Sequence, residues 1–280
     1  MSKFYIDSGK IKKIQECSIS ADYVFGINEM IYETVRLVDT QPLFLKQHLQ
    51  NMRDTIDVLL MSCPSNFTYA EISKQISRLL NVNKVYKGGV CKIILYRKSS
   101  VFDTHTSTEL SYALFIQAIE HATFSFNTKG IRLALHPSVL LQKPLLYSMY
   151  SAHMAVQHKS KQLLQTMGAD AIAYFNESAD VFHSSHGDVF YIKNKVVYCP
   201  SPEINTFRFP LSDFLLQNLS KIDMKYVEQT ACAIDSFLQA DEVFIVNPLH
   251  GVQWVVSCNE TTYMCKFSRQ IFTLLATVSE

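Results

Sequence analysis

The chain has 280 residues, of which 48% are hydrophobic and 18% charged, and its formal net charge is +1. This composition is typical of a globular protein of one or two domains, and it argues against a disordered chain and against nucleic-acid binding. No apolar stretch approaches the ~20 residues of a membrane span. Residues 1–13 are polar and the seven cysteines are widely spaced, so we expect a cytoplasmic protein with reduced thiols and no secretion signal.

The N-terminal part of the chain is predicted to combine strands with two helices. Apolar side chains recur at helical spacing over residues 45–61, which predicts the first helix. Thr68 and Glu71 have the spacing of a capping box and predict the start of the second. Short runs rich in β-forming residues predict strands at residues 4–6, 91–97 and 111–118.

Residues 119–129 are weakly patterned, and the predicted boundary between two domains lies there. We expect a smaller N-terminal domain over residues 1–120, an interdomain segment over 121–129 and a larger C-terminal domain over 130–280. Both predicted domains mix helices with strands, so the pattern predicts an α+β fold.

In the C-terminal part, a long helix over residues 148–167 is predicted to end at Gly168. Asn194 and Lys195 are expected to form a turn between two strands, and Pro210 is expected to open a helix. The remaining predicted elements are strands at residues 131–136, 171–175, 188–192, 196–199, 242–246 and 252–256, and a terminal helix at 266–276.

Three segments carry a resemblance to a known family. Residues 25–36 read FGINEMIYETVR and precede His48-Leu49, which is similar to G-x-F-E-T-x-R … H-L-x-R-L. Residues 168–176 (GADAIAYFN) and 185–193 (SHGDVFYIK) are similar to G-x-D-E-x-L-L-L-N … S-N-x-F-x-V-K, with Asp188 in place of the second asparagine. Residues 240–255 (ADEVFIVNPLHGVQWV) are similar to A-D-E-x-F-L-T-N … G-I-x-x-V.

In this order and spacing, the segments resemble the fold-type-IV, or class IV, aminotransferases that depend on pyridoxal 5′-phosphate (PLP). This family includes branched-chain and D-amino-acid aminotransferases and 4-amino-4-deoxychorismate lyases. The resemblance implies a two-domain fold like that of D-amino-acid aminotransferase, PLP as the cofactor between the domains, and a homodimer. PLP chemistry requires a lysine amine, a charged partner for the pyridine nitrogen and donors for the phosphate.

Two residues compete for the position of the family's lysine. Lys143 begins the segment KPLLY, which is similar to K-[ST]-x-N-Y. However, the family's lysine precedes the glycine of G-x-D by nearly the distance from Tyr150 to Gly168 (168 − 150 = 18), whereas Lys143 requires 25 (168 − 143). We therefore favour Tyr150, whose hydroxyl group cannot form a Schiff base and is a poor base near neutral pH.

The other cofactor positions also differ from the family's pattern. His183 lies seven residues before Phe190, where the family has the carboxylate that faces the pyridine nitrogen. A histidine cannot supply a fixed negative charge there. In the phosphate site, Asn51 takes the place of the arginine of H-L-x-R-L. Further degenerate cofactor positions are Asn205 and Thr206, in the segment NTFR that replaces the loop G-[IV]-x-R, and Asn247 beside Pro248 in the third motif.

Together, these replacements predict a protein with a degenerate PLP site that lacks PLP-dependent catalysis and binds a small metabolite in the interdomain cleft. The alternative is an active aminotransferase or 4-amino-4-deoxychorismate lyase that uses Lys143, with Tyr32 and Arg97 recognising the substrate. His183 and His186 have a spacing that could hold a metal ion, but no third ligand is evident, so no metal site is expected.

Overall fold

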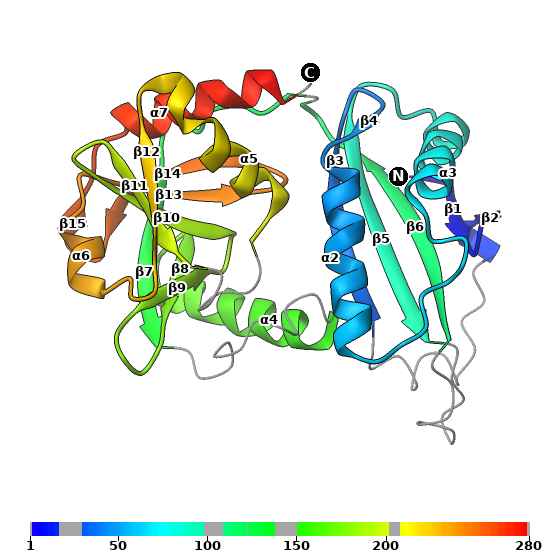
Figure 1. Ribbon diagram of the computed structural model, residues 1–280, viewed down its shortest axis with the longest axis horizontal. Coiled ribbons are helices and arrows are strands. Elements are labelled where there is room, and N and C mark those ends of the chain that lie inside the picture. The colour runs from blue at the N-terminus through cyan, green and yellow to red at the C-terminus, as the bar shows by residue number, and fades with distance from the viewer. Residues whose placement is uncertain are drawn as a thin grey trace. The chain divides into compact units, whose positions relative to one another are not determined.

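The computed structural model describes residues 2–16, 30–97, 109–121, 123–137, 150–201 and 208–278, with the backbone alone for residues 150–157. The chain divides into two units (Figure 1). The N-terminal unit comprises residues 1–123 and 148–153, and the C-terminal unit comprises 124–147 and 154–280. None of the helices in the described ranges has the length and apolar character needed to cross a membrane.

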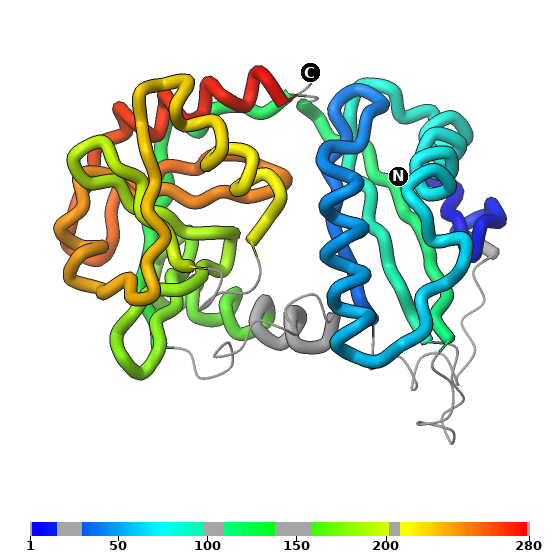
Figure 2. The backbone as a smooth tube through the Cα atoms, in the orientation of Figure 1, coloured from blue at the N-terminus to red at the C-terminus, as the bar shows by residue number. Residues whose placement is uncertain are grey.

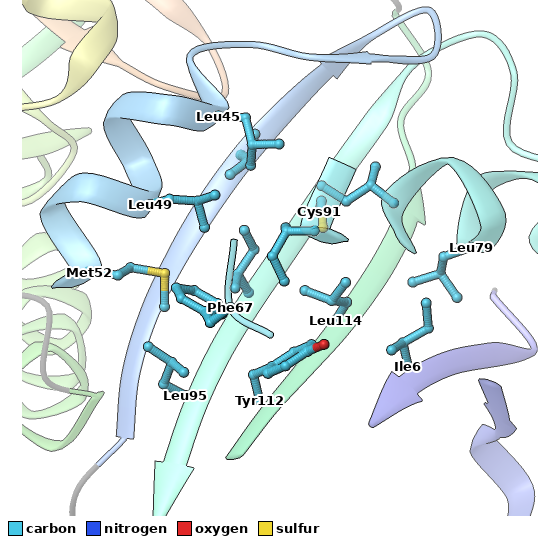
Figure 3. Packing of buried hydrophobic residues seen from close by; sticks show 14 of the residues in the cluster. Ile6, Leu45, Leu49, Met52, Phe67, Leu79, Cys91, Leu95, Tyr112 and Leu114 are labelled. Carbon is cyan, nitrogen blue, oxygen red and sulfur yellow. The ribbon is translucent and has the colours of Figure 1, made fainter. Parts of the chain in front are cut away.

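The N-terminal unit is built on an antiparallel sheet with the strand order β2-β1-β6-β5-β3-β4. The strands are β1 (Phe4–Asp7), β2 (Lys10–Lys13), β3 (Met30–Val38), β4 (Gln41–Pro42), β5 (Gly89–Arg97) and β6 (Leu110–Ala118), and the helices are η1 (Ile14–Glu16), α2 (Leu45–Val58) and α3 (Tyr69–Asn83). Alternate side chains of β3, β5 and β6 meet the apolar stripes of α2 and α3, because successive strand residues point to opposite faces. Figure 3 shows this core, with Leu49 and Met52 of α2 facing Cys91, Leu95 and Leu114 of the sheet.

The two helices of this unit begin as the sequence predicts, but one of them ends early. The Thr68 hydroxyl accepts a hydrogen bond from the Glu71 N–H at 3.3 Å, whereas the Glu71 carboxylate accepts from Gln75 instead of closing the capping box. Helix α2 ends at Val58 and not at residue 61 as predicted. Leu60 adopts a positive φ of 53° and its side chain is 84% exposed, so it lies outside the buried stripe that had suggested a longer helix.

The C-terminal unit is built on a nine-stranded mixed sheet in which the main strand order is β12-β11-β10-β13-β14-β7-β8-β9, with β15 beside β14. Its strands are β7 (Ile131–Pro137), β8 (Ala171–Phe175), β9 (Val181–Ser184), β10 (Asp188–Lys193), β11 (Val196–Pro200), β12 (Lys225–Gln229), β13 (Glu242–Asn247), β14 (Gly251–Cys258) and β15 (Thr261–Thr262). Its helices are α5 (Pro210–Asn218), η3 (Leu219–Ile222), α6 (Ile234–Leu238), α7 (Lys266–Thr273), η4 (Leu274–Thr277) and most of α4 (Tyr150–Met167), whose residues 150–153 are assigned to the N-terminal unit.

Helices α4, α5, α6 and α7 pack against this sheet. One core cluster includes Val189, Val243 and Ile245 of the central strands with Phe237 of α6. Helices α5 and α7 pack against β13, and α7 also contacts β14. In Figure 2, α5 is yellow, β13 and β14 are orange and α7 is red. On β8 and β9, Tyr174 and Phe182 pack with Leu163 and Leu164 of α4.

Local sequence signals in this unit are mostly confirmed. Asn194 and Lys195 both adopt positive φ angles, 53° and 64°, as a tight turn between β10 and β11 requires. Pro210 occupies the first turn of α5 as expected. The segment around His183 forms the buried strand β9, which was not predicted, and the residues directly after Ser184 form a turn. Strand β12 was not predicted, because four of its five residues are exposed and no alternation is visible.

Candidate functional site

The start of helix α5 is held by a buried carboxylate from strand β10. Asp188 Oδ2 accepts a hydrogen bond from the Phe209 N–H at 2.8 Å and another from the Ser212 hydroxyl at 2.6 Å. Burial raises the pKa of Asp188 to about 7, although these two donors and the nearby Arg208 favour its charged form. The internal carboxylate therefore occupies the positive end of the helix, where an external anion would otherwise be stabilised.

The cation next to this helix start is engaged by other protein groups. Arg208 Nη1 contacts the carboxylates of Glu228 at 2.8 Å and Asp213 at 3.4 Å. Its Nη2 donates to the Pro200 carbonyl oxygen at 3.0 Å and lies 3.8 Å from the Cys199 sulfur. Arg208 thus connects β11, β12 and α5.

Two neighbouring turns meet beside Asp188. A Cβ atom added to Gly187 would lie 2.1 Å from the Val246 carbonyl oxygen, so only glycine fits between β10 and β13 at this point. Asn247 donates from its side-chain nitrogen to the His186 carbonyl oxygen, and its own oxygen accepts from the N–H groups of Leu249 and His250. Asn247, a predicted cofactor position, therefore shapes the β13–β14 turn and ties it to the β9–β10 turn.

His183 lies in a row of side chains that crosses three strands. The strand register pairs His136 of β7 with Tyr174 of β8, and Tyr174 with His183 of β9. Tyr174 is buried and its hydroxyl lies 2.5 Å from the Ser160 hydroxyl of α4. His183 is only 4% exposed. The predicted pyridine-facing position is thus occupied by a buried imidazole in a strand.

The family-like residues of the N-terminal unit hold its elements together. The carboxylate of Glu33 on β3 lies 2.8 Å from Nδ1 of His48 on α2, and both side chains are buried. Arg36 is also buried and donates to the carbonyl oxygens of His121 and Thr123 at 2.9 and 3.0 Å. These side chains connect β3 to α2 and to the backbone of His121 and Thr123, which gives a structural reason for the residues of the first motif.

The other predicted residues of this unit lie on separate elements. Asn51 is half-buried on α2, where its backbone carbonyl oxygen accepts a hydrogen bond from the Thr55 hydroxyl. Tyr32 lies on β3 opposite Ile94, and the Lys92 ammonium group is 4.5 Å from the centre of its ring. Arg97 is the last residue of β5. Since Ile94 and Arg97 are three positions apart, Tyr32 and Arg97 project from opposite faces of the sheet.

Several predicted positions fall outside the described side chains. Tyr150 is the first residue of α4, for which the structure gives the backbone alone. Lys143, Asn205 and Thr206 lie outside the described residues. Among the residues that are described, no group of three histidine, cysteine, aspartate or glutamate side chains could hold a metal ion.

Sequence reasoning missed the role of two buried carboxylates. Asp188 appeared only as a replacement for asparagine, and Glu242 only as part of a motif. In the structure Glu242 Oε1 accepts from the Phe267 N–H at 2.7 Å, and Oε2 accepts from the N–H and the hydroxyl of Ser268 at 2.8 and 2.7 Å. The available signal was a charged residue at the start of an apolar strand, which requires a partner when buried.

Solved structures that are similar to this chain include branched-chain aminotransferases and a protein provisionally assigned as a lyase. A branched-chain aminotransferase from Thermoproteus uzoniensis with norvaline matches with a TM-score of 0.84 and 13% identity over 99% of this chain and 94% of that one. The PLP form of the branched-chain aminotransferase from Thermobaculum terrenum matches with a TM-score of 0.83 and 13% identity over 99% and 94%. A Legionella pneumophila protein provisionally assigned as 4-amino-4-deoxychorismate lyase matches with a TM-score of 0.77 and 18% identity over 95% and 97%.

These likenesses confirm the predicted fold, because similar chain paths extend over nearly the whole of each protein. The family model for amino-transferase class IV matches residues 30–258, which includes most of both units. PLP is the cofactor that this family implies. The chain belongs to the class IV aminotransferase family.

Proposed function

We propose that this chain is a class IV aminotransferase-like protein that has lost PLP-dependent catalysis. The observation that carries the proposal is the buried Asp188 carboxylate at the first turn of α5, directly after the segment NTFR that stands at the family's phosphate loop. A phosphate group at this place would meet a carboxyl group that accepts hydrogen bonds where donors are needed.

The described part of this helix start offers a phosphate few donors. Pro210 has no N–H, and the Phe209 N–H already donates to Asp188. The Ser212 and Asp213 N–H groups donate to the Phe209 carbonyl oxygen at 2.8 and 3.3 Å. Arg208 contacts two carboxylates and a carbonyl oxygen. The described residues therefore do not fit a PLP phosphate at this helix start.

The position expected to face the pyridine nitrogen supports the same proposal. His183 is buried in β9, and an imidazole has no negatively charged state that could keep a pyridine ring protonated. The family's electron sink depends on that proton. A neutral or positively charged partner at this position would make the pyridine ring a weaker electron sink.

Without PLP chemistry, the retained fold is proposed to act by binding a small anionic or aromatic metabolite or through protein contacts. We further propose that it works as a cytoplasmic homodimer. Analytical ultracentrifugation of the full chain tests the dimer, and a monomer at micromolar concentration would contradict it.

Absorbance spectroscopy of the full chain mixed with PLP tests the proposal. We expect no visible band of a lysine–PLP adduct beyond that formed by exposed lysines, and no site-specific adduct after borohydride reduction and peptide mass spectrometry. The variants are Lys143→Ala and Tyr150→Phe, with Lys161→Ala as a control for an exposed lysine on α4. A stoichiometric band that disappears only in Lys143→Ala would establish the active-enzyme alternative.

A further inference from the structure

Asp188 is a buried carboxyl group with only half of its acceptor capacity used. The residue is 5% exposed, and both of its hydrogen bonds, from Phe209 and Ser212, go to Oδ2. Within the described residues, Oδ1 has no hydrogen-bond partner. An ionised carboxylate can accept about four hydrogen bonds, so enclosing it with two leaves a large part of its hydration unreplaced.

The groups around Asp188 do not neutralise it by direct contact. On β13, the residue opposite is the apolar Val246. From the segment before α5, Arg208 directs its nitrogens to Glu228, Asp213 and the Pro200 carbonyl oxygen. Arg208 favours the charged form of Asp188 from a distance, while Asp213 on α5 opposes it. On β11, burial is the main cause that raises the pKa of the Cys199 thiol, and the nearby Asp188 contributes to the same shift.

We infer that Asp188 is a proton-controlled latch on the first turn of α5: the protonated carboxyl group keeps the turn closed on β10, and ionisation favours an open turn in which water reaches the carboxylate. In the closed turn, burial raises the pKa of Asp188 to about 7. In the open turn the carboxyl group is hydrated, and its pKa returns toward the ordinary value of 3.8. The two states therefore differ in proton affinity, and proton uptake and closing are linked.

The direction of the effect follows from this difference. Between pH 4 and pH 7 the closed turn binds a proton that the open turn does not, so raising the pH favours opening. In the middle of this window each pH unit multiplies the opening equilibrium constant by about ten, and above about pH 7.5 the constant levels off. The latch belongs to the C-terminal unit alone and operates whether or not a cofactor binds.

Hydrogen exchange of the full chain, measured by mass spectrometry between pH 5.5 and 8.5, tests the latch. Peptides that contain Phe209 to Ser212 report the opening of the first turn after correction for the intrinsic exchange rate. We expect the opening constant to rise about eightfold from pH 5.5 to 6.5 and to level off above about pH 7.5. In Asp188→Asn, which cannot ionise, the constant should not change over this range.

Two further variants make the result decisive. Asp235→Asn removes an exposed carboxylate on α6 and should leave the wild-type profile unchanged. Ser212→Ala removes a donor that favours the charged form of Asp188, so the levelling-off point should move to higher pH. This variant provides a test even if Asp188→Asn does not fold. A wild-type opening constant that is independent of pH, or an unchanged profile in either Asp188→Asn or Ser212→Ala, would overturn the inference.

Discussion

Two helices of the C-terminal unit begin on buried carboxylates, and the two differ in how fully the carboxylate is bonded. Glu242 and Asp188 lie toward opposite ends of the paired strands β13 and β10, since Glu242 is opposite Ile192 and Asp188 is opposite Val246. At α7, three donors from Phe267 and Ser268 reach both oxygens of Glu242. At α5, two donors reach a single oxygen of Asp188.

This difference in hydrogen bonding distinguishes the start of α7 from the start of α5. A buried carboxylate with donors on both oxygens exchanges its water for protein donors of similar strength, so it can hold a helix start. When one oxygen of a buried carboxylate has no hydrogen-bond donor, the loss of water disfavours the charged form, and protonation relieves this cost. The following predictions test whether the two helix starts differ in this way.

The largest effect is expected at the turn that positions Asp188. Gly187→Ala places a methyl group 2.1 Å from the Val246 carbonyl oxygen at a φ of +150°, so the ends of β10 and β13 must separate. We expect a loss of about 3–5 kcal/mol in the free energy of unfolding, measured by urea denaturation. Gly168→Ala is the control: its φ is +61° but no atom lies within 4 Å, so it should cost only about 1–2 kcal/mol. Equal losses would contradict the steric explanation.

The next largest effect is expected at the fully bonded carboxylate. In Glu242→Gln, one carboxylate oxygen becomes an amide NH₂ group that faces an N–H donor of α7. One hydrogen bond is lost, and two donor groups then face each other. We expect unfolding to become easier by about 2–4 kcal/mol in urea denaturation. Glu260→Gln, at an exposed position, should change stability by less than about 0.5 kcal/mol. If Glu242→Gln left the free energy of unfolding unchanged, the proposed distinction between the two helix starts would be wrong.

Asp188→Asn should have a smaller effect whose size depends on pH. The folded protein holds the proton of Asp188 up to about pH 7, whereas the unfolded chain releases it near 3.8, so this group's contribution to stability falls as the pH rises through that window. From pH 5 to pH 8 the wild type should lose about 2–3 kcal/mol relative to Asp188→Asn. Urea denaturation of both proteins at the two pH values measures this difference, and parallel pH profiles would contradict it.

The smallest effects are expected from the two buried serine hydroxyls that donate to these carboxylates. Ser268→Ala and Ser212→Ala should each cost about 1 kcal/mol at pH 7, because each removes one hydrogen bond to a buried acceptor. Ser212→Ala should cost more at pH 8 than at pH 5, since the lost donor favours the charged form of Asp188. A Ser212→Ala cost that is the same at both pH values would argue that Asp188 does not titrate in this range.

The local elements of this protein could be predicted where a single residue type imposes a backbone geometry. Thr68 begins α3, Pro210 opens α5 and Asn194 and Lys195 turn the chain between strands, and each of these follows from short-range sterics or hydrogen bonding. The end of α2 and the strands β9 and β12 were not predicted. Strand β9 depends on burial among distant segments, and the mostly exposed β12 depends on its pairing with β11. In the candidate site, residue types could be assigned to motif positions, but the bonding of Asp188 to α5 depends on residues 21 to 24 positions away.

By itself, the sequence determined the two-part α+β architecture and the class IV family, because ordered motifs and local periodicity survive in the linear chain. Only the tertiary structure decided that Asp188 and Glu242 each start a helix and that one is fully bonded and the other is not. Burial and hydrogen-bond partners are properties of segments brought together by folding. Two buried carboxyl groups at helix starts can therefore behave differently, depending on how many donors the fold brings to each.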